Sequence, residues 1–348
     1  MNAPIRLVCA VCALCCALAL GTSSHFASAQ QQPQSADVIL TGGRIFTADA
    51  SAPWAEAIAI RGARIVAIGT NADIARLATP RTRRIELAGR TVVPGFEDAH
   101  DHVGLAGIGG TRVVMDPSPT PDPSLAAVID SIVAATRRAQ PATWISATVG
   151  AQVFDDPRAT RALLDSIAPR HAVWLSGWSG HGAVLNTPAL RGAGLFGAPD
   201  PPGGWQTRNA AGVTTGRIDE YALYGASRRL ALLRQQDNGS ALAAAFRRAD
   251  DAGLRLGITT VQDMATGYDL AALRRTVKRG GGTRARHRVI PFPLTDTKGR
   301  RASEWRTTAA DSAITSRMEV SGIKWILDGT PIERLALMRQ PYTDRPGW

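Results

Sequence analysis

The stretch Pro94-Gly95-Phe96-Glu97-Asp98-Ala99-His100-Asp101-His102 ends in two histidines that are separated by a single residue. Side chains alternate between the two faces of an extended strand, so both imidazoles face the same way, with Cα atoms about 6.6 Å apart. Two imidazole nitrogens at that separation can converge on one metal ion. The alternative is a chance pair of exposed loop histidines. The β-branched run Thr91-Val92-Val93 just before the stretch favours a strand, and hence a metal site.

Asp98 lies two residues before His100 and therefore on the same face of the predicted strand. A carboxylate beside a metal-binding histidine commonly fixes the orientation of the imidazole ring. We therefore expect Asp98 to orient one of the two histidines.

The first 29 residues have the three features of a secretory signal peptide. Arg6 is the charged start, the uncharged apolar run extends from Leu7 to Leu20, and Ala27-Ser28-Ala29 is a small-residue cleavage site. The apolar run of about 14 residues is shorter than the roughly 20 that cross a bilayer. We expect cleavage after about Ala29, a periplasmic or secreted protein, and no membrane span in the mature chain. All 4 cysteines precede the cleavage site, so no disulfide is expected.

The chain is basic, with a formal net charge of +11. Nucleic-acid-binding proteins gather basic residues on one face, often interleaved with aromatic side chains. Here the arginines are scattered, and the densest runs, residues 81–84 and 284–288, contain no aromatic residue. We interpret these runs as solvated faces and expect no nucleic-acid partner.

The mature chain shows two different sequence patterns, one in its first part and one in its last part. From Ala36 to Leu87, short apolar runs alternate with glycine turns, which predicts a small antiparallel sheet. From Tyr221 onward, helical and strand-like patterns alternate, which predicts parallel strands joined by crossover helices. The predicted early strands are 37–40, 44–47, 57–60, 64–69 and 84–87, with a helix at 71–77; the later helices are 124–140, 221–233, 239–256 and 269–279, and the later strands 257–264, 288–292 and 322–327.

Six blocks of the sequence together resemble the amidohydrolase superfamily, and within it the amidohydrolase family 3 group that includes proteins similar to N-substituted formamide deformylase. In chain order the blocks are ADVILTGGRIFTAD (36–49), VVPGFEDAHDH (92–102), SGHGAVLNTPALRGAGL (179–195), PDPPGGWQTRNAAGVTTGRIDE (199–220), GITTVQDM (257–264) and GIKWILDGTP (322–331).

The resemblance implies an α/β fold with a metal-dependent hydrolase barrel of the (β/α)8 TIM type, of which this chain holds about the first four strands. It also implies the domain order. Residues 1–29 are the signal peptide, 30–90 a small N-terminal β-sandwich portion, and 91–348 the first half of the barrel. An insertion over about 111–220 follows the first barrel strand.

The same resemblance implies the site residues. His100 and His102 would bind metal from the first strand, and Lys324, from the fourth, would be a carboxylated bridging ligand. The residues themselves equally allow Lys324 to pair with Asp328. His181 is expected to line the substrate pocket or to be a turn residue with a structural role. One or two divalent ions are expected, with zinc favoured by the imidazole ligands.

For three further residues a structural role is expected. His171 and His287 lie beside arginines at strand starts, and we interpret neither as a ligand. Asp263, near the end of the second barrel strand, is more readily structural than part of the site.

The implied function is hydrolysis of a non-peptide C–N bond, in an amide, formamide or cyclic amide, by a metal-activated water acting on a small-molecule substrate. Relatives supply two more histidines and the aspartate general base from later strands, which are expected beyond residue 348. We therefore expect a C-terminally truncated chain with little or no activity, which needs a complementary C-terminal half. The alternative is a non-catalytic, amidohydrolase-like fragment that binds a small molecule or a partner chain.

Overall fold

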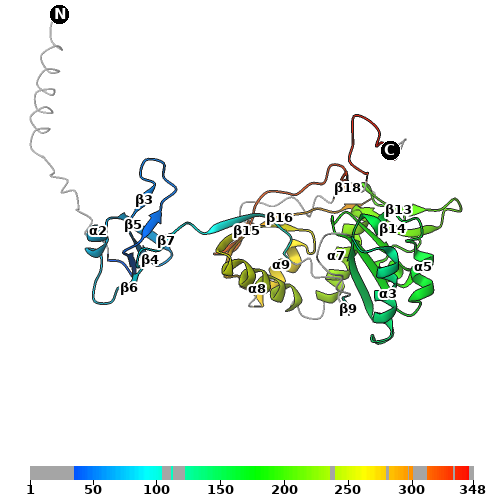
Figure 1. Cartoon of the computed structure of the whole chain (residues 1–348), viewed down its shortest axis with the longest axis horizontal. Coiled ribbons are helices and arrows are strands. Elements are labelled where there is room, and N and C mark those ends of the chain that lie inside the picture. The colour runs from blue at the N-terminus through cyan, green and yellow to red at the C-terminus, as the bar shows by residue number, and fades with distance from the viewer. Residues whose placement is uncertain are drawn as a thin grey trace, which may run out of the picture. The chain divides into compact units, whose positions relative to one another are not determined.

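The computed structural model describes residues 35–103, 111–112, 122–235, 240–279, 282–296, 298–300, 312–331 and 334–344. The predicted signal peptide therefore lies outside the described residues. The chain divides into two compact units, residues 1–94 and 95–348, and some of their elements are labelled in Figure 1.

The first unit contains two small sheets rather than one antiparallel sheet. The four-stranded sheet has the order β5-β4-β1-β6, and the three-stranded sheet has the order β3-β2-β7. The pairs β1–β6 and β2–β7 are parallel, because the chain returns to each sheet through an intervening connection rather than a hairpin. The elements are β1 (Val38–Thr41), β2 (Arg44–Phe46), β3 (Trp54–Ala55), β4 (Ala57–Arg61), β5 (Arg64–Gly69), α2 (Asn71–Ala75), β6 (Arg83–Glu86) and β7 (Thr91–Val92).

Two apolar clusters hold this unit together. In the first, Ile39 of β1 and Ile74 of α2 are both fully buried. The second joins the two sheets, because it contains Ile45 of β2, Ile58 of β4 and Leu87. Helix α2 begins at Thr70, whose hydroxyl accepts a hydrogen bond from the N–H of Asp73 and so satisfies one of the free donors of the first turn.

A six-stranded sheet with the order β13-β14-β12-β11-β10-β9 fills the region predicted as an insertion. Strand β11 (Ala172–Gly177) is buried on both faces: Trp174 packs into one apolar cluster, whereas Val173 and Leu175 pack into another. Helices therefore cover both faces of this sheet. The remaining elements are β9 (Thr111–Arg112), α3 (Leu125–Thr136), β10 (Trp144–Val149), α4 (Ala151–Phe154), α5 (Arg161–Ile167), β12 (Gly182–Leu185), α6 (Thr187–Ala193), β13 (Gly204–Arg208) and β14 (Thr214–Glu220).

A second sheet of this unit has the order β19-β20-β16-β15-β8. Its strands β8, β15, β16 and β20 run parallel to one another, as the helix–strand alternation predicts. Its elements, with the helices that connect them, are β8 (Phe96–Asp101), α7 (Tyr221–Gln235), α8 (Ser240–Arg255), β15 (Ile258–Ala265), α9 (Leu270–Lys278), β16 (Arg286–Pro291), β19 (Ala313–Thr315) and β20 (Met318–Val320); a short pair, β17 (Thr295–Asp296) and β18 (Gly299–Arg300), lies between β16 and β19.

The prediction of a strand at 322–327 is wrong, because the fourth parallel strand is β20 and ends at Val320. Gly322 has φ +76°, a left-handed conformation that interrupts an extended strand. The backbone nevertheless stays beside β16: Ser321 N–H donates to the carbonyl of Val289, and Lys324 N–H donates to that of Pro291, both at 2.9 Å. Lys324 is thus held just beyond the end of the strand.

The core of the parallel sheet is formed with the helices that connect its strands. Phe246 of α8, Leu273 of α9 and Val289 of β16 are all buried in one cluster, and α8 and α9 lie together beside the sheet (Figure 1). Among the helices that the structure describes, none combines the length and the apolar character needed to span a bilayer.

Candidate metal centre

His100 and His102 meet at the carboxyl end of β8. Their Nε2 atoms lie 3.3 Å apart. Two nitrogens that bind one tetrahedral ion, each at about 2.0–2.1 Å, are separated by about 3.3–3.4 Å. The two rings are therefore already arranged as a pair of ligands to a single ion would be.

The carboxylates next to these histidines bind backbone atoms rather than the rings. Asp98 Oδ1 accepts from the N–H of His100 at 3.0 Å, and Asp101 Oδ1 accepts from the N–H of His102 at 2.7 Å. The expectation that Asp98 orients an imidazole directly is thus wrong. Asp98 instead contacts the backbone near the carboxyl end of β8.

The ring of His102 is held by the end of the neighbouring strand. Its Nδ1 lies 3.0 Å from the carbonyl oxygen of Met264 and 3.0 Å from the hydroxyl of Thr266. A proton on Nδ1 satisfies the carbonyl and leaves the lone pair on Nε2, which is the form that binds metal. Burial, and next the positive charge of Lys324, lower the pKa of His102 and so favour the neutral ring.

Lys324 approaches the same pair of rings from the loop after β20. Its Nζ lies 3.3 Å from Nε2 of His100, and burial lowers the pKa of this amine. Asp328, the other partner that the sequence allows for Lys324, accepts instead from the N–H of Leu337 at 3.0 Å. The structure therefore brings the three predicted ligands together, and their role in binding metal stays a prediction.

Asp263 connects β15 to the end of β8. It is fully buried, and it accepts hydrogen bonds from the N–H of Val103 at 2.9 Å and from the hydroxyl of Tyr268. Burial raises the pKa of Asp263 to about 8, and the charge of Asp101 adds to this. These contacts give Asp263 the structural role that the sequence favoured.

The residues at this site could supply some, but not all, of the ligands that a metal ion takes. Over the described ranges, no group of three or more His, Cys, Asp or Glu side chains has the spacing of a metal site. The two imidazoles together with Lys324 offer at most three ligands, whereas zinc in proteins takes four, one of them often water at a catalytic site.

His181 lies apart from these ligands, at the turn between β11 and β12. Its Nδ1 is 3.0 Å from both carboxylate oxygens of Glu220 and 3.1 Å from the hydroxyl of Tyr224. Sequence reasoning missed Glu220, Tyr224 and Thr266 as members of these two sites. No spacing pattern points to them, although Glu220 ends one of the blocks that carry the family resemblance.

Two further histidines among the described residues are buried and structural in their contacts. His287 Nε2 lies 2.8 Å from Oδ1 of Asp250, and both side chains are almost fully buried. His171 has its Nδ1 3.3 Å from the carbonyl of Thr143. These contacts agree with the interpretation that neither histidine is a ligand.

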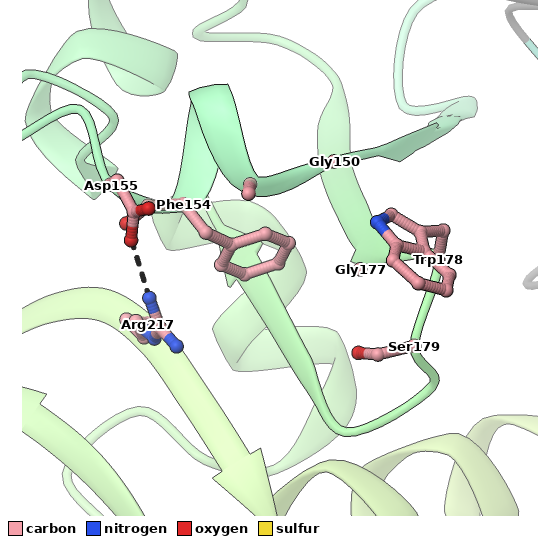
Figure 2. Close-up of a pocket in the computed structure, with 8 residues that line it drawn as sticks. Gly150, Phe154, Asp155, Gly177, Trp178, Ser179 and Arg217 are labelled. Atoms are coloured by element: carbon pink, nitrogen blue, oxygen red, sulfur yellow. Dashed lines mark hydrogen bonds between the residues drawn. The ribbon is translucent and has the colours of Figure 1, made fainter. Parts of the chain in front are cut away.

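A small, shallow depression lies at the carboxyl ends of β10 and β11, with the Phe154 ring between Arg217 and Trp178 in the view of Figure 2. The guanidinium of Arg217 lies 4.8 Å from the centre of the Phe154 ring and donates to the Phe154 carbonyl at 3.2 Å. It also pairs with Asp219 at 3.2 Å. The charge of Arg217 is therefore already balanced within the protein.

Comparison with known proteins gives a consistent result. A model of the amidohydrolase family matches residues 83–348. The chain is 31% identical to N-substituted formamide deformylase of Arthrobacter pascens over 272 residues, which is 76% of this chain and 48% of the relative. It is 30% identical to the protein LONG AFTER FAR-RED 3 of Arabidopsis thaliana over 231 residues, which is 66% of this chain and 38% of the relative.

The fold is similar to that of an uncharacterized metal-dependent hydrolase of Pyrococcus horikoshii, with a TM-score of 0.56 and 19% sequence identity. The similarity covers 89% of this chain and 59% of the solved one. The chain thus spans less than two thirds of the length of each of these relatives.

Proposed function

The chain belongs to the amidohydrolase family, and on that premise we propose that it acts in metal-dependent hydrolysis of a non-peptide C–N bond, in an amide, formamide or cyclic amide. The observation that carries the proposal is the 3.3 Å separation of the His100 and His102 Nε2 atoms, with Lys324 Nζ a further 3.3 Å from His100. This group lies at the carboxyl ends of parallel strands, where barrel enzymes place their active sites.

The finer fold is part of the same proposal. Residues 91–348 would form about the first four strands of a (β/α)8 barrel, with the insertion after the first strand, and residues 30–90 a small β-sandwich portion. Secretion to the periplasm or the medium after cleavage near Ala29 is likewise proposed from the sequence.

Each residue has a proposed role. His100 and His102 would hold a divalent ion, with zinc the first choice for imidazole ligands, and Lys324, carboxylated, would supply an anionic oxygen ligand. A bound ion would polarise the amide carbonyl and lower the pKa of water. Thr266 and the Met264 carbonyl would keep the Nε2 lone pair of His102 directed toward His100.

Activity of the 348-residue chain is proposed to be low. The described residues supply two histidines and one lysine, and they contain no group of three or more His, Cys, Asp or Glu side chains that could hold a metal. We propose that a complementary segment supplies the remaining ligands and the base. The partial ligand set also supports a second candidate function, a non-catalytic member of the family that binds a small molecule or a partner chain.

Metal content and formate release test the proposal. The purified chain would be loaded with zinc, its metal content measured, and formate release followed from an N-substituted formamide, the substrate class in the name of the Arthrobacter relative. Slow, zinc-dependent release that disappears in the H100N/H102N double variant supports the hydrolase. Hydrolysis that persists in the double variant contradicts it, and tight small-molecule binding without turnover favours the binding protein.

A further inference from the structure

His181 and Glu220 form a second chemical group that the metal centre does not explain. Resting on the proposed function, we propose that this pair is an acid–base group for the same reaction. His181 Nε2 would donate a proton to the leaving nitrogen of the amide, and Glu220 would be the positioning residue that makes this possible.

The geometry is that of an imidazole held by a buried carboxylate. Both oxygens of Glu220 lie 3.0 Å from His181 Nδ1, and Glu220 is only 2% exposed. Further support comes from the backbone, where the N–H of Glu220 donates to the carbonyl of His181 at 3.0 Å. A buried carboxylate on Nδ1 fixes the proton there and orients the ring, as in hydrolases that use a His–carboxylate pair.

The other ring nitrogen is available. Within the part of the chain that the structure describes, His181 Nε2 makes no hydrogen bond, and the side chain is 21% exposed. His287 is a useful contrast, because its Nε2 is the atom that contacts Asp250 and its side chain has no exposed surface. The second ring nitrogen of His287, Nδ1, also has no hydrogen-bond partner among the described residues, but it is buried, whereas the His181 side chain is partly exposed to solvent.

Glu220 also has a strained backbone. Its φ is +52°, in the left-handed region that non-glycine residues rarely occupy. Such a conformation is unfavourable for a residue with a Cβ and tends to persist where a side chain has a specific task. Here the strained residue is the last of β14 and places its carboxylate directly against His181.

Helix α7 connects this pair to the strand ends that carry the metal ligands. Tyr224, whose hydroxyl contacts His181, packs edge-on against Phe292, with ring centres 5.1 Å apart. Phe292 follows Pro291, the residue whose carbonyl accepts from Lys324. The pair and Lys324 are therefore joined through consecutive contacts.

A second connection runs through the next turn of the same helix. Arg228, four residues after Tyr224, is buried and donates to the carbonyls of Ala265 and Thr266. Thr266 is also the residue whose hydroxyl contacts His102. One helix, α7, thus contacts both His181, through Tyr224, and the end of β15, through Arg228.

The proposed step balances as follows. Water adds to the carbonyl carbon, the C–N bond breaks, and its electron pair goes to nitrogen. The nitrogen takes the proton from His181 Nε2. The ring is then neutral and keeps its Nδ1 proton, which is hydrogen-bonded to Glu220. A proton released from the added water restores Nε2–H. The sum is an amide and water giving a carboxylic acid and an amine.

The pair is tested by ring-nitrogen NMR on the 348-residue chain labelled with ¹⁵N-histidine, with H181Q used to assign the resonance. A protonated Nδ1 in the wild type, and a shift toward the Nε2–H tautomer in E220Q, are expected. A wild-type His181 in the Nε2–H tautomer overturns the pair. This measurement needs neither metal nor turnover.

The acid role is tested by comparing two zinc-dependent reactions of the same chain, on an N-alkylformamide and on N-(4-nitrophenyl)formamide. The alkylamine needs a proton to leave, whereas nitroaniline leaves with little help. H181Q should lower kcat about 100-fold on the alkyl substrate and less than about 10-fold on the nitrophenyl one. E220Q should change the ratio of the two kcat values, alkyl over nitrophenyl, in the same direction by a smaller factor.

The ratio of the two kcat values does not depend on the folded fraction, so a merely structural role leaves it unchanged. H171Q, which alters a buried histidine away from the pair, is the matched control and should keep the wild-type ratio. Equal losses on both substrates in H181Q overturn the acid role. A wild type that hydrolyses neither substrate refutes the acid role together with the proposed hydrolase, whereas the NMR result still decides whether the pair exists.

Discussion

The hydroxyl of Thr266 lies 3.0 Å from Nδ1 of His102, a contact between residues 164 positions apart in the chain. The carbonyl of Met264 lies at the same distance from the same atom. Both partners belong to the end of β15, so the direction of the His102 lone pair depends on the pairing of β15 with β8. The metal site is therefore organised by the sheet as well as by its ligands.

Removing the Thr266 hydroxyl should weaken zinc binding. We expect T266A to raise the zinc Kd about 10-fold, since loss of a group that orients a ligand typically costs 10–100-fold in metal affinity. T266S keeps the hydroxyl and should retain most of the affinity. Calorimetric titration of the apo chain measures both, and equal Kd values for T266A and wild type would contradict the orienting role.

The two histidines should contribute to one shared ion. H100N and H102N are each expected to raise the zinc Kd by at least about 100-fold, because each removes a direct ligand from a small set. H181Q, which changes a histidine of a different site, should leave zinc affinity within about twofold of the wild type. A single substitution with no effect would show that the two imidazoles do not bind the same ion.

Asp263 should make stability fall as the pH rises. Its pKa is raised by burial from 3.8 in the unfolded chain to about 8 in the folded chain. The folded state therefore holds one more proton between these values. This contribution is fully present below about pH 4, is lost progressively as the pH rises, and is gone above about pH 8, with a slope on the order of 1 kcal/mol per pH unit.

D263N isolates this contribution, because asparagine keeps the shape of the side chain and does not titrate. Chemical denaturation with a chelator present, at several values between pH 5 and pH 8, gives the difference in unfolding free energy between wild type and D263N. That difference should decrease steadily with pH. A constant difference over this range would mean that Asp263 is ionised in the folded protein.

Two glycines near the start of α7 should respond in opposite directions to alanine. A Cβ on Gly204 would lie 2.2 Å from the backbone nitrogen of Ala222, whereas a Cβ on Gly225 would meet nothing within 4 Å. We expect G204A to destabilise the protein by about 3 kcal/mol, because backbone must shift. G225A should stabilise it by about 0.5–1 kcal/mol, the usual gain for alanine inside a helix. Thermal unfolding of both variants distinguishes these effects.

The strain at Glu220 can be measured by comparing E220A with E220G. Both variants lose the carboxylate, but only glycine adopts φ +52° without a Cβ penalty. E220G should therefore be more stable than E220A by about 1 kcal/mol in denaturant unfolding. If E220A is as stable as E220G, the left-handed conformation relaxes on substitution and is not a fixed feature of the fold.

The regular elements near the metal centre could be predicted from local patterns. The predicted strand 257–264 corresponds to β15, and the predicted helix 221–233 corresponds to α7. The pattern failed at 322–327, where an apolar run resembles a strand but follows Gly322 in a left-handed conformation. Apolar periodicity predicts burial, but residues 323–326 are only half-buried and Leu327 is 85% exposed, so this segment is not a core strand.

Local spacing could predict the site only where its residues are close in the chain. The spacing of His100 and His102 predicted converging rings, and the family resemblance pointed to Lys324 and His181. Thr266 and Glu220 could not be predicted, because their partners lie 164 and 39 positions away. Threonine at a strand end and glutamate before a helix have no pattern that separates them from ordinary surface residues.

The sequence by itself determined the two imidazoles on one face and the alternating helices and strands, because side-chain direction and amphipathic burial follow from local periodicity. Tertiary structure alone decided which groups surround those imidazoles. Parallel pairing of β8, β15, β16 and β20 brings Thr266 and Lys324 to the histidines. The left-handed conformation of Glu220 at the end of β14 places its carboxylate against Nδ1 of His181. The physical reason is that hydrogen bonds between distant segments depend on strand register and helix packing, which only the folded chain defines.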